Sequence, residues 1–180
     1  MNTWIALFRG INVGGNNILP MNVLAALLER LGCDEVRTYI QSGNAVFKSV
    51  EADAVKLAKT VEDAVLKKCG FVPRVVLLSR KDLEKAAKAN PFPQADAAPK
   101  TLHLAFLAEK PKNPDLAALN AVKSDTEELV LAGKVVYLYT PEGFGISKLV
   151  ERYERLLGVT GTARNWNTVT KLREMAKEAG

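Results

Sequence analysis

The sequence is poor in the side chains from which many catalytic and metal sites are built. Its 180 residues include two cysteines, Cys33 and Cys69, and a single histidine, His103. These are too few for a zinc site made of cysteine and histidine, so we expect both thiols to be reduced and structural. His103 alternates with two leucines and has no nucleophile motif around it, which indicates a structural residue. We therefore expect no metal and no other cofactor.

The sequence also contains no long apolar run, and we expect no targeting leader. The stretch Met1-Asn2-Thr3-Trp4 leads directly into a strand-like segment, without a basic leader, a long apolar segment or a small-residue cleavage site. Hydrophobic residues make up 48% of the chain and charged residues 25%, which is ordinary for a globular protein. The sequence thus predicts a cytoplasmic protein that does not enter a membrane, with length for one sizeable core or two small ones.

Positive charge is concentrated in one segment of the chain. Between Lys56 and Lys88 the sequence has nine lysines and arginines but four acidic residues, an excess equal to the net charge of +5 of the whole protein. A basic face of this kind favours an anionic small molecule or nucleic acid as partner. The alternative interpretation is a pair of lysine-rich helices that are simply solvated.

The hydrophobic pattern of the first half predicts the order strand, helix, strand, strand, helix, strand. The helices are marked by leucine and valine at helical spacing, and each is followed by a glycine that ends it, while Ser42-Gly43 offers a tight turn between the middle strands. The expected elements are a strand over 4–8, a helix from Pro20 to Gly32, strands over 36–40 and 44–48, a helix ending at Gly70 and a strand over 72–78. This is the ferredoxin-like, split β-α-β pattern.

The second half resembles a looser copy of the same plan. Ser79 and Asp82 suggest a capping box that opens a connecting helix to about Ala89. The other expected elements are a strand over 101–107, a helix over 114–122, a hairpin of 127–131 and 135–139, and helices over 146–157 and 166–177. The fold class predicted is α+β, with two ferredoxin-like half-domains, antiparallel sheets and a C-terminal helix. We expect the half-domains to cover residues 1–79 and 101–180, joined by a helix and loop over 80–100.

A glycine- and asparagine-rich loop follows the first predicted strand. Arg9, Asn12, Gly14 and Gly15 lie in it, and glycine allows backbone N–H groups to converge on a ligand. Two of its glycines have Walker A spacing, but Asn16-Asn17 stands where Lys-Ser/Thr is required, so a nucleotide triphosphatase is not expected. The alternative interpretation is a structural turn that uses glycine for positive φ angles.

A second polar segment, containing Gln41, Ser42 and Asn44, occupies the turn after the second predicted strand. In a split β-α-β unit the first two strands are parallel, with the third between them. The loop after the first strand and the turn after the second therefore belong to the same end of the sheet. The sequence predicts one polar site formed by both segments.

Two further candidate regions lie late in the chain. Four candidate residues open the last helix: Arg164, Asn165, Trp166 and Asn167. Asn165 is a candidate N-cap, with Thr162 as the alternative, and Trp166 is either a stacking platform for a base or an anchor for the helix. Lys148 enters the preceding helix after a glycine loop and is a candidate anion ligand.

Together these motifs resemble a bacterial family that is catalogued only as a domain of unknown function. The resemblance rests on RGINVGG from Arg9 to Gly15, TYIQSGN from Thr38 to Asn44 and RNWNT from Arg164 to Thr168, and it spans nearly the whole chain. It implies a two-part fold of ferredoxin-like character and implies no activity. Similar proteins often carry lysine at the position of Asn16, so a cationic role for this position is not expected here.

Three functions remain open from the sequence. The first is a binding module for an anionic ligand, a nucleotide or RNA, that uses the glycine, asparagine and arginine loops. The second is an enzyme acting on a small phosphorylated or amide-bearing substrate, although the motifs contain no evident proton carrier. The third is a structural or protein-interaction role. The sequence favours the first, and it indicates neither catalytic residues nor an oligomeric state.

Overall fold

The computed structural model describes residues 1–180 and divides into two compact units. Unit 1 comprises Met1–Lys85 and Lys171–Gly180, and unit 2 comprises Ala86–Thr170. The division falls inside two helices, α3 (Arg80–Lys88) and α6 (Trp166–Glu178), so each of these helices contributes to both units.

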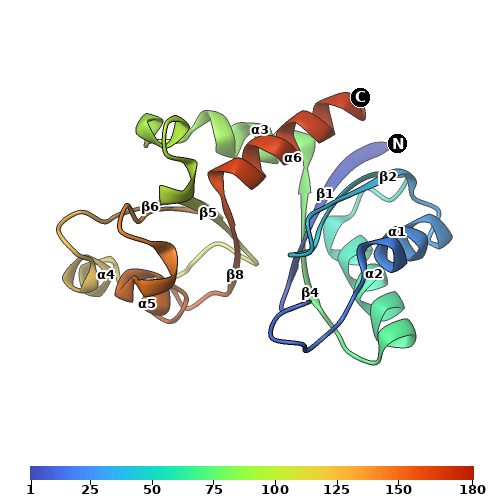
Figure 1. Cartoon of the computed structure of the whole chain (residues 1–180), viewed down its shortest axis with the longest axis horizontal. Coiled ribbons are helices and arrows are strands. Elements are labelled where there is room, and N and C mark those ends of the chain that lie inside the picture. The colour runs from blue at the N-terminus through green and yellow to red at the C-terminus, as the bar shows by residue number, and fades with distance from the viewer. The chain divides into compact units, whose positions relative to one another are not determined.

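Unit 1 is a four-stranded antiparallel sheet with two helices on one face (Figure 1). Its elements are β1 (Asn2–Arg9), α1 (Met21–Arg30), β2 (Asp34–Tyr39), β3 (Asn44–Ser49), α2 (Ala54–Cys69) and β4 (Arg74–Ser79). The strand order is β2-β3-β1-β4. Because β1 and β2 both run antiparallel to β3, they are parallel to each other, as the split β-α-β pattern predicted.

Capping side chains and a glycine set the ends of the helices in unit 1. The Asp53 side chain accepts hydrogen bonds from the N–H groups of Val55 and Lys56, which caps α2, and Gly70 ends that helix in the left-handed conformation. Ser79 accepts from the N–H of Asp82 at the start of α3, confirming the predicted cap. The apolar faces of α1 and α2 pack on the alternating inward side chains of β1 and β3 to form one core.

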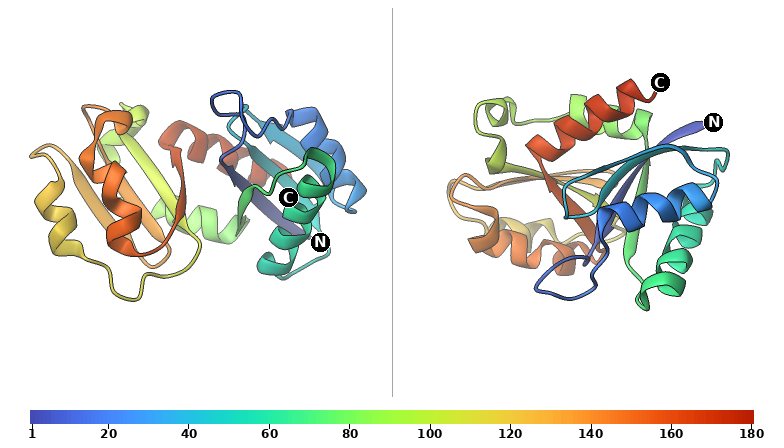
Figure 2. Two further views of the ribbon diagram at one scale, coloured as in Figure 1. Left: turned by 90° about the horizontal axis from the view of Figure 1, so that it is seen from below. Right: turned by 45° about the vertical axis from the view of Figure 1, so that its right-hand side comes forward.

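Unit 2 has the same topology, with strand order β6-β7-β5-β8. Its elements are β5 (Leu102–Leu107), α4 (Leu116–Val122), β6 (Glu128–Ala132), β7 (Val135–Tyr139), α5 (Lys148–Leu157) and β8 (Gly161–Asn165), with short 3-10 turns at Pro93–Asp96, Pro99–Thr101 and Phe144–Ile146. Helices α4 and α5 lie side by side on one face of this sheet (Figures 1 and 2). The two antiparallel sheets and the C-terminal helix confirm the predicted fold class.

Strand β8 was not predicted from the sequence. Its five residues, Gly161 to Asn165, include one β-branched side chain and run directly into α6, so the pattern of a strand is weak there. Pairing with β5 forms the strand nonetheless. An added Cβ on Gly161 would lie 2.9 Å from Leu107 Cδ2, so the close approach of the neighbouring strand favours glycine at this position.

The central strands of each sheet, β1 and β3 in unit 1 and β5 and β7 in unit 2, are largely buried on both faces. In unit 1, Ile5, Leu7 and Val46 point away from the helix-covered face and are fully buried. In unit 2 the corresponding face is covered in part by the segment before β5, because the Tyr137 hydroxyl donates to the carbonyl of Ala86 at 2.7 Å. Neither sheet therefore offers the open face on which single-stranded RNA stacks in RNA-recognition domains. None of the helices combines the length and the apolar composition that a membrane crossing requires.

Candidate functional site

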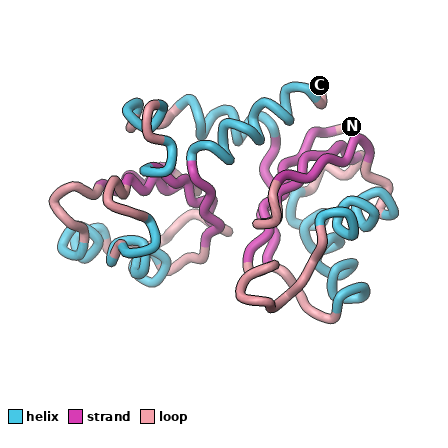
Figure 3. Tube along the Cα trace, viewed as in Figure 1, coloured by secondary structure: helices cyan, strands magenta, loops and turns pink.

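The glycine loop after β1 is a small hairpin. The N–H of Asn16 donates to the carbonyl of Val13 at 3.0 Å, and the two central residues, Gly14 and Gly15, have φ angles of 58° and 77°. Positive φ at both central positions defines a type I′ turn. Figure 3 shows this loop as a long uncoiled segment between β1 and α1. Helix α1 starts at Met21, beyond the hairpin, so the loop does not have the form of a Walker A loop.

Asn12 ties this loop to the turn after β2. Its Nδ2 donates to the carbonyls of Leu19 and Gln41, each at 2.9 Å, and its Oδ1 accepts from the N–H of Leu19 at 2.8 Å. Both amide hydrogens and the amide oxygen are therefore used inside unit 1. Asn12 also has a φ of 55°, a conformation that asparagine tolerates better than most residues. The predicted proximity of the two loops is confirmed by the bond to Gln41.

Asn44 organises the turn itself. Its side chain is fully buried, and its Nδ2 donates to the carbonyl of Tyr39 at 3.0 Å and to Ser42 Oγ at 3.2 Å. The neighbouring carbonyl of Gly43 accepts from the N–H of Phe8 at 2.8 Å. The two asparagines thus fix the backbone of both loops.

Seven of the twelve candidate ligand-binding residues lie in unit 1 and come together at this end of its sheet. Gly14, Gly15, Gln41 and Ser42 are exposed there, and Arg9 is partly buried at the end of β1. The groups that remain accessible to a ligand at the two loops are therefore mostly neutral backbone and side-chain groups.

The third motif lies in unit 2 and is largely buried. Arg164 is 9% exposed, and its Nη1 donates to the carbonyl of Ala163 at 2.9 Å. Burial lowers the pKa of its guanidinium to about 10, so it remains charged at neutral pH. Asn165 Oδ1 accepts from the N–H of Thr168 at 2.9 Å, which makes Asn165 the N-cap of α6, as predicted.

Trp166 is held inside unit 2. It is 7% exposed, and its indole N–H donates to Asp96 Oδ1 at 2.7 Å. In this position the ring anchors the start of α6, while Asn167 beside it is exposed. Lys148 is exposed as the first residue of α5, where Ser147 Oγ caps the helix by accepting from the N–H of Val150.

His103 lies on β5, and its ring stacks on that of Phe144 with 3.8 Å between ring centroids. Burial lowers its pKa to about 4, so it is neutral at pH 7. No group of three or more His, Cys, Asp and Glu side chains is placed to hold a metal ion.

The cations of the basic segment fall into two kinds. On α2, Lys56 pairs with Glu51 and Lys59 with Asp63. Lys67 and Lys68 of the same helix are exposed and take part in no ion pair. On α3, the exposed side chains of Arg80, Lys81 and Lys85 take part in no ion pair. The sequence identified the segment but not this division, because a pairing depends on which side chains face each other.

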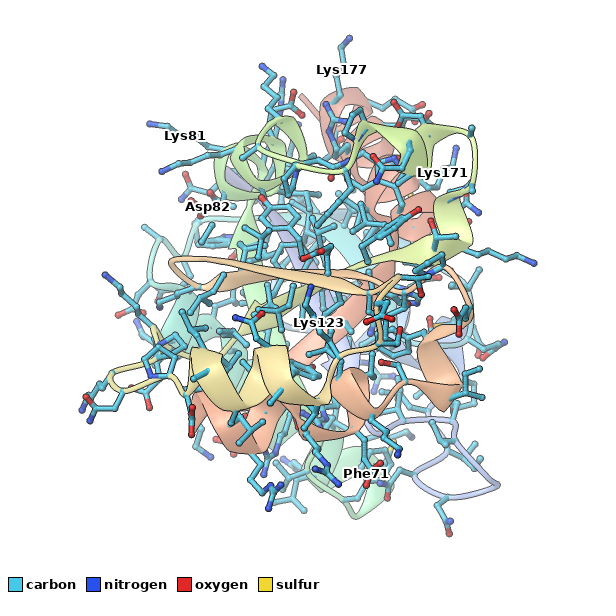
Figure 4. The ribbon with its side chains drawn as sticks, turned by 90° about the vertical axis from the view of Figure 1, so that its left-hand side faces the viewer. Phe71, Lys81, Asp82, Lys123, Lys171 and Lys177 are labelled. Atoms are coloured by element: carbon cyan, nitrogen blue, oxygen red, sulfur yellow. The ribbon has the colours of Figure 1, made fainter.

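Helix α6 adds a further cation beside α3 in unit 1. Arg173 forms two hydrogen bonds with the Glu84 carboxylate, from Nε at 2.9 Å and Nη2 at 3.0 Å, which joins the two helices. Lys177 follows one turn after Arg173, is exposed and takes part in no ion pair. In Figure 4 the side chains of Lys81 and Lys177 extend away from the ribbon. We call Arg80, Lys81, Lys85 and Lys177 the α3/α6 cation surface.

The architecture and the motif geometry define an α+β protein built from two ferredoxin-like units. The chain belongs to the family described as protein of unknown function (DUF1697), which matches residues 1–137. The first two motifs lie within the matched residues and the third lies beyond them.

Among solved structures, the chain is similar to the conserved bacterial protein SP0830 from Streptococcus pneumoniae. The TM-score is 0.70 with 24% sequence identity, and the match covers 97% of this chain and 98% of that chain. At this identity the likeness shows the fold alone. No curated protein matches the chain.

Proposed function

We propose that the protein is a binding module for an anionic ligand, the phosphate groups of a nucleotide or of single-stranded RNA. The observation that carries the proposal is the α3/α6 cation surface, whose exposed side chains have no acidic partner. Unit 1 contains fifteen lysines and arginines against eleven acidic residues, a net charge of +4, whereas unit 2 has ten against nine. The excess of positive charge therefore belongs to the unit that presents these unpaired cations.

The mode of binding follows from what the fold offers. Since the central strands of each sheet are largely buried on both faces, bases cannot stack on them as they do in RNA-recognition domains. Lysine and arginine side chains on two adjacent helices instead contact phosphates, which gives binding with little sequence preference and a strong dependence on salt.

The loop motifs make a smaller contribution to this proposal than the sequence suggested. The amide Nδ2 atoms of Asn12 and Asn44 donate hydrogen bonds to backbone carbonyls, which supports an architectural role for these two residues. The exposed Gly14, Gly15, Gln41 and Ser42 remain as neutral hydrogen-bonding groups for a ligand.

The test is fluorescence anisotropy of a short labelled oligoribonucleotide titrated with the protein over a series of salt concentrations. With three to four phosphates neutralised, we expect the logarithm of the binding constant to fall with the logarithm of salt concentration with a slope of about −2 to −3. The double variant Lys81→Gln/Lys85→Gln should weaken binding and make the slope shallower by about 1.4, roughly 0.7 for each lysine.

The matched control is Lys56→Gln/Lys59→Gln, which removes two lysines that already have acidic partners on or beside α2. It should change affinity and slope much less. Equal losses in both double variants would show non-specific attraction to net charge, and absence of binding at about 50 mM salt would overturn the proposal. Mononucleotides added as competitors distinguish the two sources of phosphate.

A further inference from the structure

Three connecting segments of unit 1 meet at one end of its sheet. They are the glycine loop after β1, the turn between β2 and β3, and the loop between α2 and β4, which together with the adjoining strand and helix ends cover residues 9–20, 39–44 and 66–74. Arg9 lies opposite Arg74 across β1 and β4, and Asn12 donates to the carbonyl of Gln41, so the segments are neighbours. In Figure 1 the glycine loop and the loop between α2 and β4 both reach the lower end of the unit.

This end of unit 1 exposes a group of aliphatic side chains. Val13 is 68% exposed, and the side chains of Ile18, Ile40 and Val72 are each about half exposed. All four belong to the loops and the turn rather than to the strands and helices that form the core. Single exposed apolar residues are ordinary on a protein surface, but several gathered at one place indicate an interaction surface.

Ile40 is moreover held in a conformation that isoleucine disfavours. Its φ is 48°, in the left-handed region, where a β-branched side chain is a clear outlier. Glycine or asparagine would adopt this conformation with less strain. Burial in a core would offset the strain, but about half of the Ile40 side chain is exposed. A strained and exposed isoleucine indicates a role outside the packing of unit 1.

The charge at this end has one sign. The three segments contain no aspartate or glutamate and four cationic residues, which are Arg9, Lys67, Lys68 and Arg74. Of these, Lys67, Lys68 and Arg74 are exposed and take part in no ion pair. The exposed aliphatic side chains are therefore accompanied by positive charge that no carboxylate within the three segments neutralises.

The opposite end of the same sheet provides a contrast. Val50 and Val55 are 78% and 80% exposed there, but two acidic residues, Glu51 and Asp53, lie between them in the sequence. The α3/α6 cation surface also belongs to that end, because β4 leads away from Arg9 and runs directly into α3. The combination of exposed aliphatic side chains, unpaired cations and no acidic residue thus distinguishes the end at which the loops meet.

We propose that this end of unit 1 docks on the surface of an anionic lipid bilayer. The residues that make the contact, which we call the loop-end surface, are Val13, Ile18, Ile40, Val72, Lys67 and Lys68. The aliphatic side chains contact the boundary between headgroups and acyl chains, and the lysines contact lipid phosphates. Attachment to a lipid surface depends on buried apolar area together with attraction to anionic headgroups, and the loop-end surface supplies both.

A lipid surface fits these residues better than a nucleic acid does. The phosphates of RNA would use the lysines but leave the aliphatic side chains in water, whereas a bilayer accommodates both kinds of group. Docking of this kind holds a protein at one face of a bilayer and requires no helix that crosses it. The loop-end surface shares no residue with the α3/α6 cation surface, so this proposal stands independently of the function proposed above.

The test is co-sedimentation of the protein with vesicles of phosphatidylcholine that contain roughly a third phosphatidylglycerol, compared with vesicles of phosphatidylcholine alone. We expect the protein to bind the anionic vesicles and to bind the neutral vesicles at least about tenfold more weakly. Lys67→Gln/Lys68→Gln should weaken binding to the anionic vesicles about 25-fold, roughly fivefold for each lysine.

Val13→Ser/Val72→Ser removes apolar area without a change in charge. It should weaken binding about a hundredfold, roughly tenfold for each valine withdrawn from lipid. The matched control is Val50→Ser/Val55→Ser, which removes two exposed valines from the opposite end of the sheet and should bind as the wild type does. The emission of Val13→Trp should shift to shorter wavelength on addition of anionic vesicles.

This shift reports on position 13, because the two native tryptophans, Trp4 and Trp166, are already buried in the protein. An unshifted emission of Val13→Trp in vesicle-bound protein would overturn the proposal.

Lys81→Gln/Lys85→Gln should bind anionic vesicles as the wild type does, which separates this proposal from the binding of phosphates at α3 and α6. Absence of binding to anionic vesicles at low salt overturns the proposal. So does equal binding by Val13→Ser/Val72→Ser and the wild type, which would show adsorption by charge alone. If the wild type sedimented as a dimer without lipid and this variant as a monomer, the surface would join two copies of the chain, and the proposal would be wrong.

Discussion

The two units have one topology but differ in the partners of their polar side chains. In unit 1 the loop asparagines bond to neighbouring backbone, and the surface of α3 and α6 carries unpaired positive charge. In unit 2 the net charge is near neutral, yet His103 Nδ1 and Thr140 Oγ1 are buried atoms that have no hydrogen-bond partner. The same strand order thus accommodates a cationic unit and a unit with unsatisfied polar atoms. Topology alone therefore does not determine the chemistry of either unit.

The sharpest difference concerns the glycine turns between the paired middle strands. Gly43 in unit 1 has a φ of 85°, and an added Cβ would lie 2.6 Å from Ile11 Cδ1 and 2.7 Å from Phe8 Cβ. Gly133 in unit 2 has a φ of 63° but nothing within 4 Å of an added Cβ. The turn of unit 1 is packed against its neighbours, and the turn of unit 2 is open.

The largest effect is therefore expected for Gly43→Ala. Overpacking and the left-handed backbone together should lower the free energy of unfolding by about 2–5 kcal/mol. Gly133→Ala meets the backbone cost alone, about 1–2 kcal/mol. Urea unfolding monitored by circular dichroism measures both, and equal losses would mean that the turn of unit 1 is not packed as described.

A second prediction addresses the bonding of the glycine loop in unit 1. Asn12→Asp keeps the shape of the side chain and one acceptor but removes the donors to the carbonyls of Leu19 and Gln41. We expect a loss of about 2–3 kcal/mol in the free energy of unfolding.

Asn16→Asp is the matched control, because it adds the same charge to the exposed tip of the loop, where the Asn16 side chain makes one hydrogen bond, to the carbonyl of Gly14 at 3.5 Å. Its effect should stay below about 0.5 kcal/mol. If Asn12→Asp were as stable as this control but bound anions more weakly, Asn12 would have a role in ligand binding rather than in the loop.

A third prediction uses pH to separate the units, since the one histidine lies in unit 2. The pKa of His103 is about 4 in the folded protein and about 6.5 when unfolded, so the unfolded state binds more protons between these values. The contribution of the neutral His103 side chain to the free energy of unfolding is present above pH 6.5 and is lost as the pH falls to about 4.

Comparison with His103→Leu isolates this effect from the titration of carboxylates. Between pH 7.5 and pH 4.5, the wild type should lose about 2 kcal/mol more in the free energy of unfolding than the variant does. Parallel pH profiles would show that His103 is solvated in the native state.

Much of the fold could be predicted because its signals are local. The alternation of apolar residues, the glycines that end helices and the cap at Ser79 gave seven of the eight strands to within a few residues. Strand β8 escaped prediction because Gly161 to Asn165 has little β propensity of its own and becomes a strand through pairing with β5.

The candidate residues were predicted less completely than the fold. The sequence located the loops of Asn12 and Asn44 and showed that both belong to one end of the sheet. It did not show that their amides face neighbouring carbonyls, because the partners are distant in sequence or depend on the turn geometry. Thr140 gave no signal at all, since an unpaired hydroxyl is recognised by what surrounds it.

The sequence by itself determined the class of fold, the repeated order of strands and helices, and the segment that carries the excess of positive charge. These follow from periodicity, turn chemistry and composition, which act over a few neighbouring residues. The tertiary structure alone decided which lysines have acidic partners and which asparagines bond to backbone carbonyls. It also decided which polar atoms are buried without a hydrogen-bond partner. Each of these depends on side chains brought together from separate strands and helices, and on the loss of water as they pack.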